Sequence, residues 1–330
     1  MIYARTKSFF PAIGQSVFLL LFPFLFCAGV LAQDDNEIIT IDTDLVTFDT
    51  TVTDANGKPV RGLQAKDFRI FEDGVERPVE FFDIAQKANG VRPIAVVFAL
   101  DISGSMTTEE LEKLRGAMNV FIDGLAGKNA SFALMSFGMN VKTLQSFTSD
   151  KQKLQKAFDR LMRDSEGLST HTYDAVDDAI RLLNRKAPRT RSQLPVKKSV
   201  IVVTDGFPVG DTVAPSLVIE RAQAAEVSVF TVTLPSFTKV SLSKVRAPLP
   251  TPLDVSGLTE KTGGKNVYAT DKDFEPLFRA LAEDVTASYL LAFYPTEEKR
   301  RDGRFHKVKI ETRNPNFTIR QNRDGYQSKR

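Results

Sequence analysis

The chain has 330 residues, which allows about two domains, and its composition is that of an ordinary soluble globular protein. The formal net charge is +3, and Arg5 and Lys7 each contribute one of these charges, so the balance gives no reason to expect a nucleic-acid partner. The only cysteine, Cys27, lies in the same N-terminal segment, so disulfides and thiol chemistry are not expected elsewhere.

The first 32 residues have the pattern of a signal peptide. Two basic residues precede the apolar run 17–31, which Pro23 interrupts, and small residues up to Ala32 come before an acidic stretch. The run is short for a membrane-spanning helix, which needs about 20 apolar residues. We therefore expect cleavage after Ala32 and an extracytoplasmic protein, whether periplasmic, at the cell surface or released. Contact with a membrane would come only through an uncleaved N-terminal segment.

Residues 33–90 predict a β-rich module. Between residues 45 and 82 the polar and apolar residues alternate with a period of two, which is typical of half-buried strands. Asn56-Gly57 indicates a hairpin turn, and Asp73-Gly74 indicates a second turn.

From residue 91 to 295, apolar strands alternate with amphipathic helices. The expected strands are 94–100, 131–137, 141–147, 199–204, 227–234, 266–268 and 289–294. The expected helices are 111–125, 154–162, 173–183, 215–225 and 274–285. This order predicts an α/β fold with a mostly parallel sheet and helices on both faces. Strands 131–137 and 141–147 are joined by a tight turn, so we expect them to form an antiparallel hairpin.

Residues 296–330 return to a period of two, with a turn at residues 314–316. Two arrangements remain open for these C-terminal strands. They could complete the N-terminal β-rich module, which would make the α/β domain an insertion, or they could form a separate cap.

The most informative motif follows the apolar strand 94–100. Asp101, Ser103 and Ser105 come where that strand should end, and alternate residues of an extended segment face the same way. The carboxyl ends of parallel strands are where ligands bind in such sheets. One carboxylate and two hydroxyls offer hard oxygen ligands, which suit Mg²⁺, Mn²⁺ or Ca²⁺.

Two further segments strengthen this motif. Thr170 lies in a hydroxyl-rich loop before a helix, and Asp205 follows the strand 199–204 in a Thr-Asp-Gly turn. Together the three segments resemble the von Willebrand factor type A domain and its metal-ion-dependent adhesion site. Most of the chain also resembles the acidobacterial-type von Willebrand factor A-related proteins. The matching stretches are residues 52–60, 67–74, 289–295 and 323–326.

The resemblance implies a Rossmann-like, six-stranded sheet with one antiparallel edge strand. It also implies that Asp101, Ser103, Ser105, Thr170 and Asp205 hold a divalent cation, Mg²⁺ or else Mn²⁺ or Ca²⁺. The cation would bind an acidic residue of a protein partner, as in cell adhesion. The alternative is a structural scaffold of the cell envelope whose site is metal-stabilised but not adhesive. A metal-dependent hydrolase ranks third. We expect no enzyme activity, because the chain has no recognisable nucleophile motif, P-loop or dinucleotide fingerprint.

Several residues near these motifs have plainer interpretations. Thr172 is an alternative to Thr170 as the hydroxyl ligand, and either could cap the helix. Asp174 is expected to stabilise the helix N-terminus and not to bind metal. His171 is expected to be a solvated loop residue and not a ligand, since a hard oxygen site does not recruit imidazole. His306 lies on a basic strand and is expected to be exposed.

Two loops carry positive charge. The loop 185–198 is basic and contains proline, and we expect it to be solvated, the alternative being a patch that binds an acidic partner. The stretch 236–252 is longer than a typical connection, which makes it the second-choice contact surface.

Overall fold

The computed structural model describes residues 44–84, 92–103, 108–161, 169–188, 194–234, 250–269 and 274–329, all within one compact unit, 39–330. The expected signal peptide and its cleavage point lie outside the described residues, as do Ser105 and residues 236–249. In the part of the chain that is described, no helix has the length and apolarity needed to cross a membrane.

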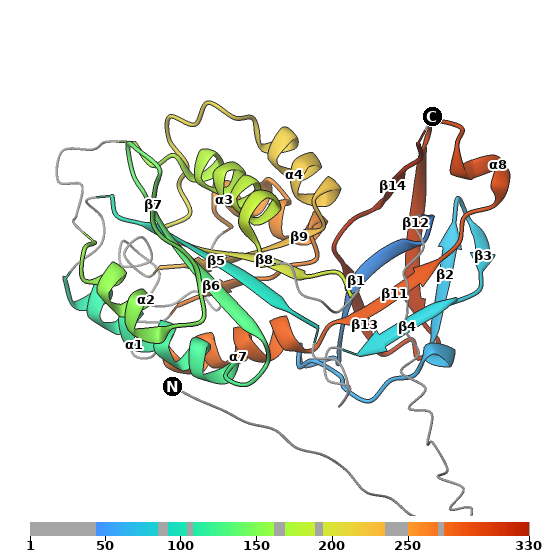
Figure 1. Cartoon of the computed structure of the whole chain (residues 1–330), viewed down its shortest axis with the longest axis horizontal. Helices are drawn as coiled ribbons and strands as arrows, with labels where there is room; N and C mark the ends of the chain where they lie inside the picture. Colours follow the sequence, from blue (N-terminus) through green and yellow to red (C-terminus); the bar gives the residue numbers. More distant parts are fainter. Residues whose placement is uncertain are drawn as a thin grey trace, which may run out of the picture. The chain divides into compact units, whose positions relative to one another are not determined.

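A six-stranded sheet forms the centre of the α/β domain, in the order β10-β9-β8-β5-β6-β7 (Figure 1). All neighbours are parallel except β6 and β7, so the prediction of a mostly parallel sheet with one antiparallel edge strand is confirmed. The strands are β5 (Ile94–Asp101), β6 (Ala130–Phe137), β7 (Lys142–Thr148), β8 (Lys197–Thr204), β9 (Val227–Thr233) and β10 (Asn266–Tyr268).

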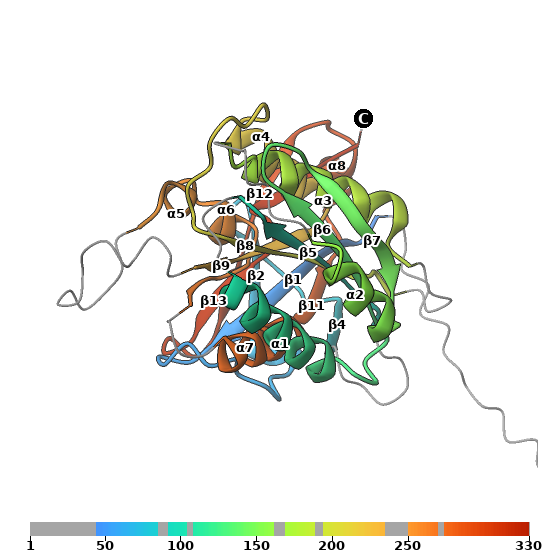
Figure 2. The same ribbon diagram turned by 90° about the vertical axis from the view of Figure 1, so that its left-hand side faces the viewer.

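Helices cover both faces of this sheet (Figure 2). On one face lie α1 (Thr108–Gly124), α2 (Lys151–Phe158) and α7 (Glu275–Thr286). On the other lie α3 (Thr172–Lys186), α4 (Pro215–Ala224) and the short α5 (Pro252–Val255) and α6 (Leu258–Lys261). Val96 and Phe98 pack into the first layer, whereas Val97 and Ala99 pack into the second. Because successive side chains of β5 face opposite layers, the strand is apolar throughout.

Two four-stranded sheets form the β-rich part, in the orders β13-β1-β11-β4 and β14-β12-β2-β3. The bounds of its elements are β1 (Val46–Thr53), η1 (Ala65–Asp67), β2 (Phe68–Glu72), β3 (Val75–Arg77), β4 (Phe81–Ile84), β11 (Tyr289–Phe293), α8 (Glu297–Arg300), β12 (Phe305–Thr312), β13 (Thr318–Gln321) and β14 (Gly325–Gln327). The two sheets share one apolar core, which includes Phe48, Ile70, Leu291 and Ile310. We call this part the sandwich.

Strands from both ends of the described chain meet in the sandwich. β12 pairs with β2, with Ile310 opposite Ile70, and β13 pairs with β1, with Ile319 opposite Val52. This pairing supports the proposal that the α/β domain is inserted into one β-domain. The boundaries at 90/91 and 295/296 remain predictions.

Two details differ from the expectations. The strand expected at 289–294 as the last of the α/β series is β11, which instead lies between β1 and β4 of the sandwich. All five residues of β11 are buried, and such an apolar strand fits either sheet equally well. The turn at Asn56-Gly57 is present, with Gly57 N donating to Asp54 O at 2.9 Å, but β1 and β2 on its two sides belong to different sheets.

Candidate metal centre

Asp101 is the last residue of β5, and its side chain is completely buried at the carboxyl edge of the sheet. Its Oδ1 accepts a hydrogen bond from the backbone N–H of Ser103 at 2.9 Å. Its Oδ2 accepts one from the hydroxyl of Thr204 at 2.8 Å, and Thr204 ends the neighbouring strand β8. The carboxylate is thus held in one orientation by its own loop and by the adjacent strand.

The electrostatic surroundings of Asp101 are unusual for a buried carboxylate. Burial raises the pKa of Asp101, hydrogen bonds from Ser103 and Thr204 oppose that rise, and the nearby carboxylate of Asp205 adds to it. Among the described residues, no lysine, arginine or histidine forms an ion pair with Asp101. A buried carboxylate beside a second carboxylate would be stabilised by a cation.

Asp205 occupies a tight turn directly after β8. Its Oδ1 accepts the backbone N–H of Phe207 at 3.1 Å, and the N–H of Gly206 donates to Thr204 Oγ1 at 3.2 Å. Gly206 has φ +88°, and a Cβ there would lie 2.7 Å from Cγ2 of Thr251. Only glycine fits this turn without strain, because it combines a left-handed backbone with a close neighbour.

Thr170 is brought against the segment that follows Asp205. Its N–H donates to Val209 O at 2.9 Å, and the N–H of Val209 donates to Thr170 O at 3.0 Å. The alternative ligand Thr172 is completely buried, and its hydroxyl donates to Thr170 O at 3.4 Å. The hydroxyl of Thr172 is therefore engaged within the loop, which favours Thr170 as the candidate. Ser105 lies outside the described residues.

The structure thus places polar groups from β5, β8 and the loop before α3 at one edge of the sheet. Asp101, Ser103, Thr204 and Asp205 are connected by the contacts described above, and Thr170 is tied by backbone pairing to the loop of Asp205. The described residues contain no group of three or more His, Cys, Asp or Glu side chains arranged to hold a metal ion. The oxygen donors present, carboxylates and hydroxyls, match the preference of Mg²⁺, Mn²⁺ and Ca²⁺.

The expectation that His306 is exposed is wrong, whereas His171 is partly exposed and also paired with a carboxylate. His171 is the N-cap residue of α3, half-buried, with Nδ1 2.9 Å from Oδ2 of Asp174. His306 is only 5% exposed, and its ring nitrogens face Asp73 and Asp302 at 2.8 and 3.1 Å. The signal for His306 was available, because it has the same parity as Val308 and therefore faces the inside of β12.

The basic loop is solvated only in part, because Arg185 and Lys186 are exposed as expected but Lys197 and Lys198 are not. Lys197 begins β8 and is buried, with Nζ 3.8 Å from Oδ1 of Asp49. The half-buried Lys198 donates to Ala225 O at 2.8 Å. Residues 189–193 lie outside the described part.

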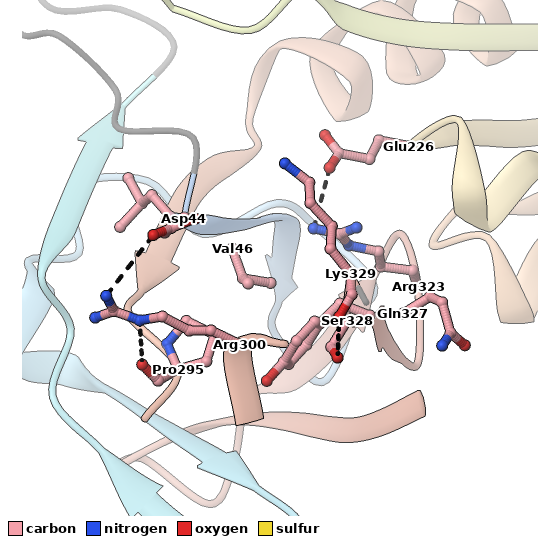
Figure 3. A pocket seen from close by; sticks show the side chains of 11 residues that line it. Asp44, Val46, Glu226, Pro295, Arg300, Arg323, Gln327, Ser328 and Lys329 are labelled. Carbon is pink, nitrogen blue, oxygen red and sulfur yellow. Dashed lines mark hydrogen bonds and ion pairs between the residues drawn. The ribbon is translucent and has the colours of Figure 1, made fainter. Parts of the chain in front are cut away.

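A cavity of about 310 Å³ lies away from this edge, lined mainly by the sandwich (Figure 3). Its two arginines are already paired within the protein. Arg323 Nη2 lies 3.0 Å from Glu226 Oε1, and Arg300 Nη1 lies 3.7 Å from Asp44 Oδ2. The two arginines of the cavity are therefore already neutralised by carboxylates of the protein, whereas Asp101 at the edge of the sheet has no such ion pair among the described residues.

The model of the von Willebrand factor type A domain matches residues 95–251. None of the curated proteins matches the sequence. The solved structures similar to this chain include an aerotolerance-related membrane protein from Bacteroides fragilis, with 16% identity, a TM-score of 0.43, and coverage of 58% of this chain and 98% of that one. Another is proximal thread matrix protein 1 from the mussel byssus with a zinc-occupied MIDAS motif, with 15% identity, a TM-score of 0.47, and coverage of 61% and 47%.

Proposed function

The chain carries a von Willebrand factor type A domain over residues 95–251, and from this premise we propose that it is a metal-dependent, adhesion-type protein-binding protein. Its site would bind an acidic residue of a protein partner. Such domains are interaction modules, and the finer assignment to a metal-bridged carboxylate is our inference from the edge of the sheet.

The observation that carries the proposal is the environment of Asp101. Its carboxylate is buried, oriented by Ser103 and Thr204, close to Asp205, and without an ion-pair partner among the described residues. Burial of an unpaired charge costs several kcal/mol, so a fold that keeps a carboxylate in this place has a reason to do so. A bound cation is the simplest reason.

We propose that Asp101, Ser103, Ser105, Thr170 and Asp205 hold the cation, Mg²⁺ or else Mn²⁺ or Ca²⁺. The hydroxyls are neutral, so a cation held mainly by them keeps much of its charge and an open position for a carboxylate of the partner. Neighbouring residues of the chain would orient the two carboxylates of the site. Thr204 and Ser103 fix Asp101, and the turn at Gly206 fixes Asp205. We further propose that the protein acts outside the cytoplasm, on the basis of the signal-peptide pattern.

Calorimetric titration with Mg²⁺, Mn²⁺ and Ca²⁺ tests the proposal directly. We expect the wild type to bind at millimolar concentration or below, Asp101→Ala to abolish binding and Asp205→Ala to weaken it strongly. Asp178→Ala is the matched control, since Asp178 is an exposed aspartate of α3 in the same domain. A wild type that binds none of the three ions would refute the proposal.

Capture of partners from an envelope extract, with Mg²⁺ or with chelator, separates the remaining functions. Partners that are lost with chelator and with Asp101→Ala support adhesion. Partners retained in both cases support the structural scaffold. Turnover of a substrate that depends on the metal would support a hydrolase.

A further inference from the structure

Asp174, in the first turn of α3, makes more contacts than the capping of a helix requires. Its carboxylate accepts the backbone N–H of Thr212 at 3.0 Å, the hydroxyl of Thr212 at 3.0 Å and the backbone N–H of Val213 at 2.9 Å. His171 Nδ1 lies 2.9 Å from its other oxygen. Thr212 and Val213 belong to the loop that follows β8, so Asp174 joins α3 to the loop that carries Asp205.

The contact is reciprocal. The backbone N–H of Asp174 donates to Oδ1 of Asp211 at 2.9 Å, so each segment supplies a carboxylate to the other. Gly210 directly precedes Asp211 and has φ +88°, and a Cβ there would meet Nε2 of His171 at 3.0 Å. The close approach of the two segments thus depends on a glycine and on two aspartates. We call the contacts of Asp174 and Asp211 the aspartate clasp.

The clasp and the Thr170–Val209 backbone pair join the same two segments at two points. Thr170 and Asp174 are four residues apart on one segment, and Val209 and Thr212 are three apart on the other. Two points of attachment prevent rotation of one segment about the other. The segment that holds Thr170 is therefore fixed relative to the loop that begins at Asp205.

The same hydrogen bonds argue against Asp174 as a ligand of the cation. Both of its oxygens are occupied by donors of the protein, and the carboxylate is half-buried. Burial would raise the pKa of Asp174, but the bonds from His171, Thr212 and Val213 outweigh it and lower the pKa. Because the oxygens of this carboxylate already accept hydrogen bonds from the protein, they are not free to coordinate a cation.

We propose that Asp174 is a positioning residue of the metal centre, which sets the placement of Thr170 relative to Asp205 by clamping residues 211–213 onto α3. This inference rests on the proposed function, because it concerns the same site. Residues that orient metal ligands typically change the metal affinity by about 10- to 100-fold when they are removed.

The experiment measures two quantities, the Mn²⁺ affinity and the melting temperature of the metal-free protein in the presence of chelator. It compares the wild type with Asp174→Ala, Asp174→Asn and Asp150→Ala. Asp150 is the matched control, because it caps α2 by accepting the N–H groups of Gln152 and Lys153 and contacts neither loop of the site. We expect both alanine variants to melt earlier, but only Asp174→Ala to lose Mn²⁺ affinity, by about 10-fold or more. Asp174→Asn keeps one acceptor oxygen and should fall between the wild type and Asp174→Ala.

The outcomes are distinct. If the wild type binds no Mn²⁺, the proposed function fails, and the inference fails with it. If the wild type binds and Asp174→Ala or Asp174→Asn binds equally well, Asp174 has no positioning role and only the inference fails. Equal losses of affinity in Asp174→Ala and Asp150→Ala would also overturn it, since the effect would then follow stability alone. Should Asp174→Ala not fold, the comparison of Asp174→Asn with Asp150→Ala decides.

Discussion

Arg92 and Asp49 form a buried ion pair between the sandwich and the α/β domain. Nη2 of Arg92 lies 2.9 Å from Oδ2 of Asp49, Nη1 contacts Oδ1, and both side chains are only 2% exposed. Asp49 lies on β1, and Arg92 lies two residues before β5. Burial raises the pKa of Asp49, but the charges of Arg92 and of the buried Lys197 outweigh this effect and lower it.

Breaking this pair should cost much of the stability of the protein. Arg92→Met removes the only cation hydrogen-bonded to the buried carboxylate of Asp49 among the described residues and leaves Lys197 and Arg323 as more distant charges. Loss of one partner of a buried pair typically costs about 3–5 kcal/mol. Urea unfolding at pH 7 measures the change. The control is Arg69→Met, since Arg69 pairs with Glu76 on the surface and such pairs contribute about 0–1 kcal/mol. Equal effects of the two substitutions would contradict the prediction.

His306 should make the stability of the sandwich depend on pH. Burial lowers its pKa, but hydrogen bonds to Asp73 and Asp302 on its two ring nitrogens outweigh burial and raise it above the usual value. Hydrogen bonds from Lys299 and then His306 lower the pKa of Asp73 to about 2. Hydrogen bonds from Ser328, the backbone of Arg304 and then His306 lower the pKa of Asp302 to about 2. The groups around the ring are these two carboxylates, Lys299 beside Asp73, and Tyr326, which stacks on the imidazole.

The sign follows from the direction of the shift. A histidine whose folded pKa is raised contributes stability fully below its unfolded pKa near 6.5, and this contribution is lost as the pH rises through the folded pKa. The wild type should therefore lose stability between neutral and mildly alkaline pH, and His306→Gln should lose less over that range. Denaturant unfolding at several pH values and NMR titration of His306 measure both effects. Identical pH profiles for the two proteins would rule out this role.

Gly206→Ala should damage the candidate site more than an ordinary loop glycine would. The new Cβ would lie 2.7 Å from Thr251 in a turn with φ +88°, so the turn of Asp205 must shift. We expect weaker Mn²⁺ binding and a loss of at least about 1 kcal/mol of stability. Gly127→Ala is the matched control, with φ +74° and nothing within 4 Å of the added atom. It should lose stability through backbone strain alone and keep its Mn²⁺ affinity.

A chain that stops after Pro295 should lose the two sheets of the sandwich unequally. β2 would lose β12 and keep only the short β3, whereas β1 would lose β13 and keep β11. Hydrogen exchange should therefore accelerate most in β2, less in β1 and least in β8, which lies in the α/β sheet. Unchanged protection of β1 and β2 would show that the C-terminal strands do not complete the sandwich.

The α/β domain was predictable because its patterns are local. The helical faces repeat every three to four residues, the parallel strands are continuous apolar runs, and the hairpin of β6 and β7 has a tight turn between two such runs. The sequence predicts the wrong sheet for β11 because pairing partners such as Phe293 and Val46 lie far apart in the sequence. The residue pattern of an apolar strand does not indicate which strands it pairs with.

In the candidate site, too, the residues marked by local sequence could be predicted and the one defined by distant contacts could not. Asp101 and Asp205 could be proposed from sequence because each follows a strand of a parallel sheet. The role of Asp174 could not, because three of its hydrogen-bond donors belong to Thr212 and Val213, 38 and 39 residues away. Two of these donors are backbone N–H groups, which every non-proline residue possesses, so no residue type marks them.

The division of the sandwich between the two ends of the described chain has a consequence for the order of folding. β1 and β2 are synthesised first, but contacts such as that of Tyr326 with Glu72 span 254 residues and must wait for the last strands. Closing so long a loop in an unfolded chain is entropically costly and slow. A folded α/β domain would hold Arg92 and Thr286 in place and shorten the effective loop to the flanking segments. We therefore expect the α/β domain to act as the template on which the sandwich closes, with the unpaired edges of β1 and β2 exposed to aggregation until then.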